Sequence, residues 1–290
     1  MDVTAAHASR IRALAALVLS VLALASLAFA GAARANYVAL GDSYAAGPLI
    51  PYPVLPLGCL KSSNNYPRLA APSIGLPLRD ATCSGAKTTN MTQQQNVSPD
   101  GPNPPQFNRL DSATQVVSLT IGGNDIGFSD IVQNCVTWNP FDRPCQRRYV
   151  VNGVDTISQR ISAAAPLVDG VLDGIRARSP QARIFVTNYP AIFPETGYGC
   201  YPQMPVSFSD APYLRSKERE LNQMIAGQVA ANGARLVDWY TASIGHDACK
   251  SSSVRWVEPI VPGNWAASVH PNRAGMQGAA NALVAAVRQP

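Results

Sequence analysis

Short apolar segments rich in β-branched residues recur along the chain and predict the strands of a sheet. Five segments of this kind are present: Tyr37–Leu40, Arg79–Cys83, Gln115–Ile121, Arg183–Thr187 and Arg235–Trp239. The first three end at or near a glycine, as strands do where the chain turns. We therefore predict five short strands, with the second the weakest because it is the least apolar.

Three longer segments between or after these strands repeat their apolar residues at helical spacing. They are Val154–Ala177, Tyr213–Ala231 and Pro271–Val287. Pro271 fits the first turn of the last helix, where a missing N–H group costs little. Strands that alternate with helices predict an α/β layer fold with a parallel sheet.

Proline-rich segments without periodicity separate these elements and are predicted to be loops. They cover residues 48–67, 96–105 and 190–212. Loops this long within one domain are usually functional or pinned. Cys59 and Cys200 lie in two of these loops and could constrain them through disulfides.

The N-terminal residues 1–35 have the pattern of a signal peptide. Arg10 and Arg12 precede an apolar run, Ala13–Ala30, and Ala33-Arg34-Ala35 is a small-x-small cleavage site. We expect cleavage after Ala35, with Ala28-Phe29-Ala30 as a second candidate site. The alternative is an uncleaved membrane anchor, since the apolar run approaches the length of a transmembrane helix.

Export changes how the cysteines are interpreted. Six are present, and an even number in an exported chain suggests three disulfides. No C-x-x-C pair occurs, which argues against a zinc ribbon or a thioredoxin-like site. Spacing alone does not choose among the possible pairings of Cys59, Cys83, Cys135, Cys145, Cys200 and Cys249.

The charge of the chain argues against nucleic-acid binding. Charged residues make up 14% of the chain, and the net charge of +5 falls by two when residues 1–35, with three arginines and one aspartate, are removed. Beyond Arg147-Arg148 no cluster of Lys and Arg remains that could follow a phosphate backbone.

Ser43 is the first candidate for chemistry. It stands in Gly41-Asp42-Ser43-Tyr44-Ala45-Ala46-Gly47, directly after the first predicted strand. A serine at a strand end can point its hydroxyl out of the sheet edge and keep its own N–H free for an oxyanion. The segment is not the G-x-S-x-G elbow of α/β-hydrolases, because Ala45 occupies the second glycine position. Alternatively, Ser43 caps a following helix.

Two further segments follow the second and third predicted strands. Gly85 in Ser84-Gly85 would let a backbone N–H approach a ligand closely, or it is simply a turn glycine. Asn124, in Gly122-Gly123-Asn124-Asp125, could donate its side-chain amide to an oxyanion, or Asn124 or Asp125 could cap a helix. In the strand order 2-1-3-4-5, the carboxyl ends of the first three strands meet at the switch point. Ser43, Gly85 and Asn124 would then surround one crevice.

The candidate bases are few. Of three histidines, His7 belongs to the signal peptide, which leaves His246 and His270. We interpret His246, next to Asp247 and Cys249, as a surface histidine of a disulfide loop. His270, in His270-Pro271-Asn272 before the last helix, is the expected base.

Taken together, Gly41-Asp42-Ser43, Gly85, Gly123-Asn124 and His270 resemble, in order, the four blocks of the GDSL/SGNH hydrolase family. The cysteines and the extended Gly-Gly-Asn-Asp-Ile-Gly-Phe block resemble its secreted actinobacterial lipases and esterases. The resemblance implies a flavodoxin-like three-layer α/β/α fold with a five-stranded parallel sheet in residues 36–290. It also implies the disulfides Cys59–Cys83, Cys135–Cys145 and Cys200–Cys249.

The resemblance further implies Ser43 as nucleophile, His270 as general base, and an oxyanion hole of Ser43, Gly85 and Asn124. One position departs from the family pattern, because Ala267 stands where an aspartate three residues before the histidine is usual. We expect a main-chain carbonyl, of Ala267 or Trp265, to orient His270 in its place. Asp247 and Glu258 are the alternative orienters.

These observations predict a secreted, monomeric serine esterase or lipase that needs no metal or organic cofactor. Its substrate is expected to be a lipid or a short-to-medium acyl ester, with transient contact to a lipid surface. Leu49, Ile50, Val54 and Leu55 could line an acyl groove or could be packing residues. The alternatives are a carbohydrate O-acetylesterase and a non-catalytic secreted binding module.

Overall fold

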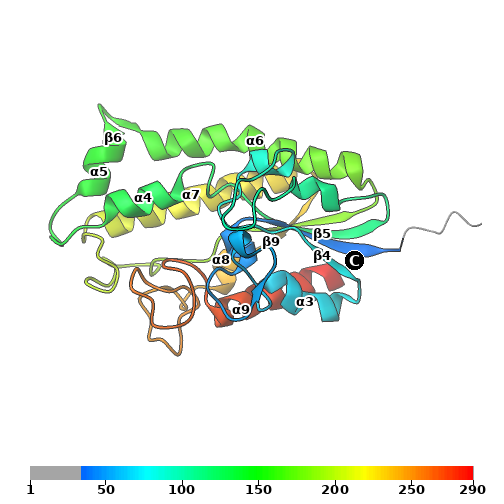
Figure 1. Ribbon diagram of the computed structural model, residues 1–290. Helices are drawn as coiled ribbons and strands as arrows, with labels where there is room; N and C mark the ends of the chain where they lie inside the picture. Colours follow the sequence, from blue (N-terminus) through cyan, green and yellow to red (C-terminus); the bar gives the residue numbers. More distant parts are fainter. Residues whose placement is uncertain (1–33, 290) are drawn as a thin grey trace, which may run out of the picture. The chain divides into compact units, whose positions relative to one another are not determined.

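A computed structural model describes residues 34–289 of the chain (Figure 1). Residues 1–33, which hold most of the expected signal peptide, lie outside this range, so cleavage rather than retention as an anchor stays a prediction. Within residues 34–289, no helix is both long enough and apolar enough to cross a membrane.

A five-stranded parallel sheet forms the centre of the fold. Its strands lie in the order β4-β1-β5-β8-β9, which is 2-1-3-4-5 when these five are numbered along the chain, as predicted. Register is continuous at the centre, where Val38 of β1 pairs with Val117 of β5. The strands are β1 (Asn36–Gly41), β4 (Leu78–Asp80), β5 (Thr114–Thr120), β8 (Arg183–Thr187) and β9 (Arg235–Val237).

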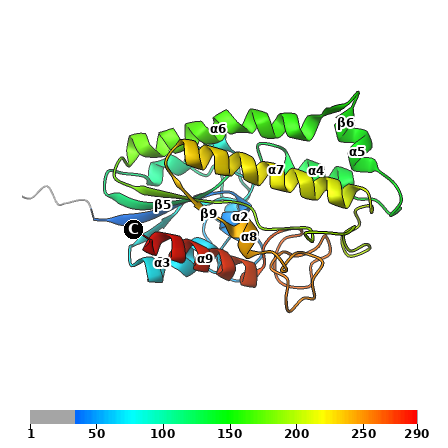
Figure 2. The same ribbon diagram turned by 180° about the vertical axis from the view of Figure 1, so that it is seen from behind.

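Helices cover both faces of the sheet and complete the expected α/β/α layers (Figures 1 and 2). On one face α6 (Thr156–Arg178) packs against α7 (Asp210–Ala231), and on the other α3 (Tyr66–Ile74) packs against α9 (Arg273–Arg288). The apolar spacing that predicts α6 is confirmed, because Ile157, Ile161 and Ala164 all point into the core. Its N-terminus is capped by the side chain of Asp155.

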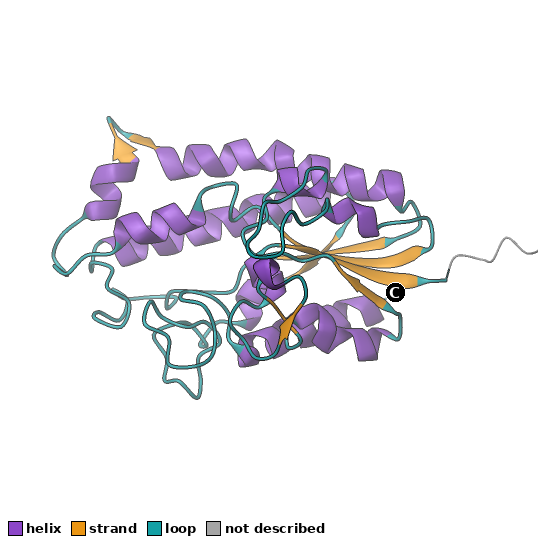
Figure 3. Cartoon of the chain, viewed as in Figure 1, coloured by secondary structure: helices purple, strands orange, loops and turns teal. Residues whose placement is uncertain are grey.

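Shorter elements occupy the connections, and most lie at the carboxyl ends of the strands, where the long loops also gather (Figure 3). They are the α-helices α2 (Ser43–Ala46), α4 (Phe128–Cys135), α5 (Pro144–Tyr149) and α8 (Trp239–Ala242), the 3-10 helices η1 (Leu57–Cys59), η2 (Thr88–Met91) and η3 (Gln106–Arg109), and the paired strands β2 (Pro53–Val54) with β3 (Lys61–Ser62) and β6 (Val150–Val151) with β7 (Val154–Asp155).

Several boundaries differ from the sequence prediction, among them the starts of α3 and α9. Helix α3 begins inside the segment predicted to be a loop, because Asn65 caps its N-terminus and Pro67 falls in its first turn, where proline is tolerated. Helix α9 begins at Arg273 rather than at Pro271. The side chain of Asn272 accepts a hydrogen bond from the Gly275 N–H group and so sets the start of α9.

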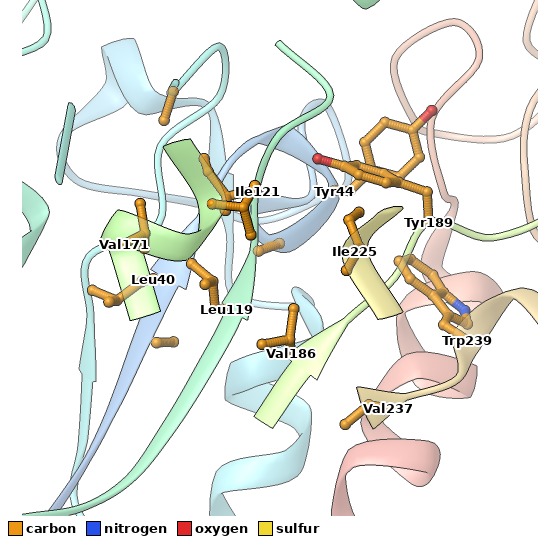
Figure 4. Packing of buried hydrophobic residues seen from close by; sticks show 14 of the residues in the cluster. Leu40, Tyr44, Leu119, Ile121, Val171, Val186, Tyr189, Ile225, Val237 and Trp239 are labelled. Atoms are coloured by element: carbon orange, nitrogen blue, oxygen red, sulfur yellow. The ribbon is translucent and has the colours of Figure 1, made fainter. Parts of the chain in front are cut away.

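The core lies between the sheet and its helices, and Figure 4 shows part of it. Leu40 and Leu119 from the central strands pack close to Val171 of α6, and each is buried. Tyr44 and Tyr189 stand at the carboxyl end of this core, with ring centroids 5.0 Å apart and nearly perpendicular planes. The aromatic pair thereby connects the core to the edge of the sheet where the motifs of Ser43, Gly85 and Asn124 lie.

Three disulfides pin the loops, and all three expected pairings are confirmed. Cys59–Cys83 ties the loop after β2 to the segment after β4. Cys135–Cys145 joins the end of α4 to α5. Cys200–Cys249 ties the long loop after β8 to the segment after α8, which are 49 residues apart in sequence.

Candidate active site

Ser43 lies at the first position of α2, immediately beyond the carboxyl end of β1. The turn requires glycine at position 41, because φ is +145° there and a Cβ atom would lie 2.6 Å from the Thr120 carbonyl oxygen. Asp42, not Ser43, caps the helix, since its carboxylate accepts the Tyr44 N–H at 2.9 Å. The Ser43 hydroxyl is therefore free of a capping role.

His270 contacts this hydroxyl directly. Its Nε2 lies 2.8 Å from Ser43 Oγ, and its Nδ1 lies 2.7 Å from the carbonyl oxygen of Ser268. A carbonyl can only accept, so the proton belongs on Nδ1 and Nε2 is left as an acceptor for the serine hydroxyl. Burial lowers the pKa of His270 below its ordinary 6.5, against the opposing effect of the Ser268 carbonyl. The neutral ring needed in a general base is thus favoured at neutral pH.

The carbonyl that contacts His270 differs from both residues expected from the sequence. Ala267 O accepts the main-chain N–H of His270 at 3.2 Å and closes a four-residue turn. Val269, the third residue of this turn, has φ of +59°, as in a type II turn. In a type II turn, the peptide group between the second and third residues is flipped relative to that of a type I turn. This peptide group carries the Ser268 carbonyl, which faces the imidazole of His270. Trp265 lies further back and is 78% exposed.

Val269 occupies a backbone conformation that a β-branched residue rarely adopts. Its strain is held by contacts on every side. The Tyr44 hydroxyl donates to the Val269 carbonyl at 2.7 Å. The Val269 N–H donates to the Glu258 carbonyl at 3.1 Å. Its side chain is buried. Strain of this kind, about 1–3 kcal/mol, persists where the surroundings over-determine it, often next to a reacting group.

Neither alternative carboxylate reaches His270. Asp247 is buried and accepts the Cys249 N–H at 3.0 Å. Glu258 is fully buried and binds Arg255 and the Asn272 amide. Although burial raises the pKa of Glu258, the hydrogen bonds from Arg255 and Asn272 outweigh it and bring the pKa to about 2. Glu258 therefore organises the loop that carries His270 without touching the ring.

His246 lies apart from the other site residues. Its ring stacks on Trp256 with centroids 4.3 Å apart, and its Nδ1 lies 2.6 Å from the Val254 carbonyl oxygen. It is half-buried in this loop rather than on the open surface as expected.

Hydrogen bonds join the segments that hold Gly85 and Asn124 to the serine turn. The Cys83 N–H donates to Gly41 O at 3.0 Å, and the Asn124 side-chain amide donates to Ala86 O at 3.0 Å. Gly85 has φ of +78°, which favours glycine. Among the described residues, the N–H groups of Ser43 and Gly85 have no hydrogen-bond acceptor.

Tyr189 connects the serine turn to the Asn124 segment and was missed by the sequence analysis. Its hydroxyl donates to Asp42 Oδ2 at 2.5 Å and accepts the Gly123 N–H at 2.7 Å. Burial raises the pKa of Asp42 to about 7, against the hydrogen bonds from Tyr189 and Tyr44, which lower it. The only sequence signal for Tyr189 was its place just after the fourth strand.

A mostly apolar cavity opens beside Ser43 and His270. Its walls come from α4, α7 and the loop after β8, whose path the Cys200–Cys249 disulfide constrains. The four residues suggested as a groove, Leu49, Ile50, Val54 and Leu55, do not line this cavity, and Ile50 is buried elsewhere. The apolar lining residues include Ile126, Phe128, Val132, Ile192, Phe193, Met204, Val206, Leu214, Leu221 and Ile260.

Two carboxyl groups, those of Asp42 and Glu218, interrupt this apolar lining. Glu218 of α7 accepts the Ile192 N–H through Oε1 at 2.8 Å, while its buried Oε2 has no partner among the described residues. Burial raises the pKa of Glu218 to about 8, against the backbone hydrogen bonds from Ile192 and Phe193, which lower it. Glu218 is therefore mainly protonated at neutral pH. Within residues 34–289, no group of three or more His, Cys, Asp and Glu side chains is placed to hold a metal ion.

Comparison with known proteins places this arrangement in a family. Residues 39–277 match the model of the GDSL-like lipase/acylhydrolase family, a span that holds Ser43, Gly85, Asn124 and His270. The chain belongs to the GDSL-like lipase/acylhydrolase family. As a member of this family, it is a carboxylic ester hydrolase.

Several proteins from Streptomyces are similar to this chain. Lipase 2 of Streptomyces coelicolor is 37% identical over 247 residues, which cover 83% of this chain and 81% of that protein. The crystal structure of phospholipase A1 from Streptomyces albidoflavus NA297 matches with a TM-score of 0.72 and 28% identity, over 88% of this chain and all of that one. The extracellular lipase from Streptomyces rimosus matches with a TM-score of 0.73 and 27% identity, over 87% and 99% of the two chains.

Proposed function

We propose that the protein is a secreted serine esterase or lipase in which Ser43 is the nucleophile and His270 the general base. The observation that carries the proposal is the 2.8 Å contact between Ser43 Oγ and His270 Nε2. This contact lies at the mouth of an apolar cavity in a member of an acylhydrolase family. A nucleophile within hydrogen-bond reach of a base that a third group orients is the signature of covalent acyl transfer.

In the first half of the reaction, His270 removes the Ser43 proton as the hydroxyl attacks the ester carbonyl. His270 then passes this proton to the departing alcohol, which leaves the acyl group on Ser43. In the second half, His270 takes a proton from water, and the resulting hydroxide attacks the acyl-enzyme. The acid is released, and the proton returns to Ser43.

Three donors would stabilise the oxyanion of each tetrahedral intermediate: the N–H groups of Ser43 and Gly85 and the Asn124 amide. The free N–H groups and the hydrogen bond that anchors Asn124 beside Gly85 support this assignment. Removing one such donor typically costs about 2.7–4 kcal/mol of transition-state stabilisation.

The Ser268 carbonyl takes the orienting role that an aspartate fills in a Ser-His-Asp triad. It holds the Nδ1–H tautomer without adding a negative charge beside the ring. The imidazolium formed during catalysis therefore receives less electrostatic stabilisation than it would from a carboxylate.

The cavity supports an acyl ester of a lipid or of a short-to-medium fatty acid as the substrate. Its apolar walls would bury an alkyl chain, with each methylene worth about 0.8 kcal/mol. A carbohydrate O-acetylesterase would place a polar sugar and a two-carbon acyl group here, for which long apolar walls have no use. The lipase and phospholipase A1 named above point the same way.

We also propose that the protein is exported after cleavage behind Ala35 and acts as a monomer. Three disulfides suit an oxidising compartment, and the similar lipase from Streptomyces rimosus is extracellular. N-terminal sequencing of protein from the medium tests the cleavage site, and a start at Asn36 is expected.

The decisive experiment is hydrolysis of p-nitrophenyl esters, from acetate to palmitate, by the oxidised protein without residues 1–35. Ser43→Ala is expected to abolish turnover, while the exposed Ser253→Ala serves as the matched control and keeps it. An optimum beyond acetate supports the lipid or acyl ester assignment, and activity on acetate alone would favour an acetylesterase. Full activity in Ser43→Ala would overturn the mechanism.

A further inference from the structure

A second cavity, separate from the apolar cavity beside Ser43 and His270, lies at the β4 edge of the sheet and has a volume of about 530 Å³. Four basic side chains line it: Lys61 of β3, Arg68 of α3, Arg79 of β4 and Arg109 of η3. Asp80 is the one acidic residue in the lining. These five residues define the basic cavity.

Lys61 is the least usual member of the basic cavity. It is only 6% exposed, although lysine is rarely buried without a charged partner. Its ammonium group donates to the main-chain carbonyl of Asp80 at 3.1 Å, and it forms no ion pair with any carboxylate in residues 34–289. An ammonium group has three donors, so two remain to be satisfied.

The Asp80 carboxylate is already committed to other groups. Its Oδ2 accepts from Arg68 Nε at 2.9 Å and from the Asn65 amide at 3.0 Å. Its Oδ1 accepts from the N–H and the hydroxyl of Thr82 at 3.1 and 2.6 Å. The Asp80 carboxylate therefore pairs with Arg68 and forms no direct ion pair with Lys61.

The two remaining arginines, Arg79 and Arg109, also differ in whether a carboxylate pairs with them. Arg79 forms an ion pair with Asp111 outside the cavity. The guanidinium of Arg109 has no hydrogen bond or ion pair in the part of the chain that the structure describes. Two positive charges, on Lys61 and Arg109, thus face one cavity without an ion-pair partner among the described residues.

The pKa of Lys61 agrees with the absence of an ion-pair partner. Burial lowers the pKa of Lys61, and Arg68 and Arg109 lower it further, while Asp80 partly opposes them. Because like charges repel, an anion between Lys61 and Arg109 would give both of them a favourable interaction. The amides of Asn103 and Asn108 also line the cavity and could donate to such an anion.

We propose that the basic cavity binds a phosphate-type oxyanion, either free phosphate or the phosphodiester of a lipid headgroup, through Lys61 and Arg109. Both ligands are negatively charged at pH 7, and two cations without an ion-pair partner would attract either of them. Arg109 supplies a planar donor pair and Lys61 a compact charge, a combination suited to tetrahedral phosphate. The inference goes beyond ester hydrolysis and holds whether or not Ser43 is the nucleophile.

Calorimetric titration with inorganic phosphate tests the proposal. The chloride concentration of the solutions is adjusted so that the ionic strength stays constant. The oxidised protein is expected to bind one phosphate saturably, and Lys61→Met and Arg109→Gln are each expected to weaken binding at least about tenfold. Lys250→Gln, which removes one positive charge elsewhere, is the matched control. Arg109 is exposed, so Arg109→Gln keeps the test valid if Lys61→Met fails to fold.

Vesicles identify the source of the phosphate group. Sedimentation with phosphatidylcholine vesicles that contain phosphatidylglycerol, competed by free phosphate and reduced in Arg109→Gln, would assign a headgroup. Phosphate binding without vesicle binding would assign the free anion. Absence of saturable phosphate binding, or equal binding by the parent and both variants, would overturn the proposal.

Discussion

At the scale of single residues, the turn before His270 holds this proposed base through contacts that local sequence does not reveal. Val269 adopts a strained conformation, and the Tyr44 hydroxyl stabilises it by a hydrogen bond to its carbonyl. The Tyr44 ring also lies against His270, with centroids 4.9 Å apart. Tyr44 is therefore a positioning residue, acting on the base through the turn and by ring contact.

Tyr44→Phe keeps the ring and removes only the hydroxyl. We expect kcat to fall by about tenfold with KM nearly unchanged, because a hydrogen bond worth about 1.4 kcal/mol no longer holds the turn. Steady-state kinetics on a soluble ester measure this. Tyr37→Phe is the matched control, since it also loses a buried hydroxyl, bonded to Ser118 at 2.7 Å away from the site. Equal loss of kcat in both variants would refute the positioning role.

The lowered pKa of His270 has a consequence for the pH profile. The base must be neutral, so the acidic limb of kcat/KM is expected to have its midpoint below 6.5. Initial rates at low substrate concentration between pH 4 and pH 9 measure it. A midpoint near 7 would instead point to Asp42, whose pKa is raised to about 7, and Asp42→Asn would then shift the limb.

The raised pKa of Glu218 predicts a pH dependence of stability. From the ordinary 4.5 to about 8, folded Glu218 holds a proton that the unfolded chain has lost. The free energy of unfolding therefore falls with rising pH across this window. Glu218→Gln should have a higher Tm than the parent at pH 8.5, by an amount that shrinks toward pH 4.5. Calorimetry measures this, with Glu220→Gln as the control from the same helix, and parallel Tm curves would contradict it.

At the scale of elements, the Cys200–Cys249 disulfide joins two segments near the apolar cavity beside Ser43 and His270. The loop after β8 supplies four of the apolar lining residues, and the segment after α8 leads to the turn that carries His270. The shorter Cys135–Cys145 link closes 10 residues at the end of α4. The two disulfides therefore differ in how much of the cavity wall each of them constrains.

Replacing Cys200 and Cys249 by serine is expected to lower the free energy of unfolding by about 4 kcal/mol, compared with about 3 kcal/mol for Cys135 and Cys145, because a longer loop gains more entropy when opened. Urea denaturation measures both. Replacing Cys200 and Cys249 should also raise KM for long-chain esters more than for acetate. An unchanged chain-length profile would show that the cavity walls hold without this link.

At the scale of the whole molecule, elements distant in sequence share one core. The C-terminal helix α9 packs against α3 from the N-terminal third, and β1 is central in the sheet between β4 and β5. Neither half of residues 36–290 can bury its apolar surface without the other. The expected single domain therefore predicts one cooperative transition.

Thermal unfolding of the oxidised protein should give coincident curves by far-UV circular dichroism and by tryptophan fluorescence. The four tryptophans lie after residue 137, whereas the sheet extends from Asn36, so the two probes sample different parts of the chain. Coincidence supports a two-state transition. Two separated midpoints would contradict the single-domain prediction.

Much of this molecule could be predicted from the sequence by itself. The periodicities located five strands and three long helices, and the right-handed crossovers of parallel strands restrict their order. The motif residues Ser43, Gly85 and Asn124 stand at strand ends, and parallel strands end at one edge. These features follow from local patterns, because side-chain periodicity decides which face of an element is buried.

Tertiary structure alone decided which groups meet. Ser268 faces His270 because Ala267 closes a turn around a left-handed Val269, and a distant Tyr44 helps to hold that turn. The cavity walls and the basic cavity likewise join segments far apart in sequence. A hydrogen bond or an uncompensated charge depends on what lies opposite in space, and no local periodicity records which residue that is.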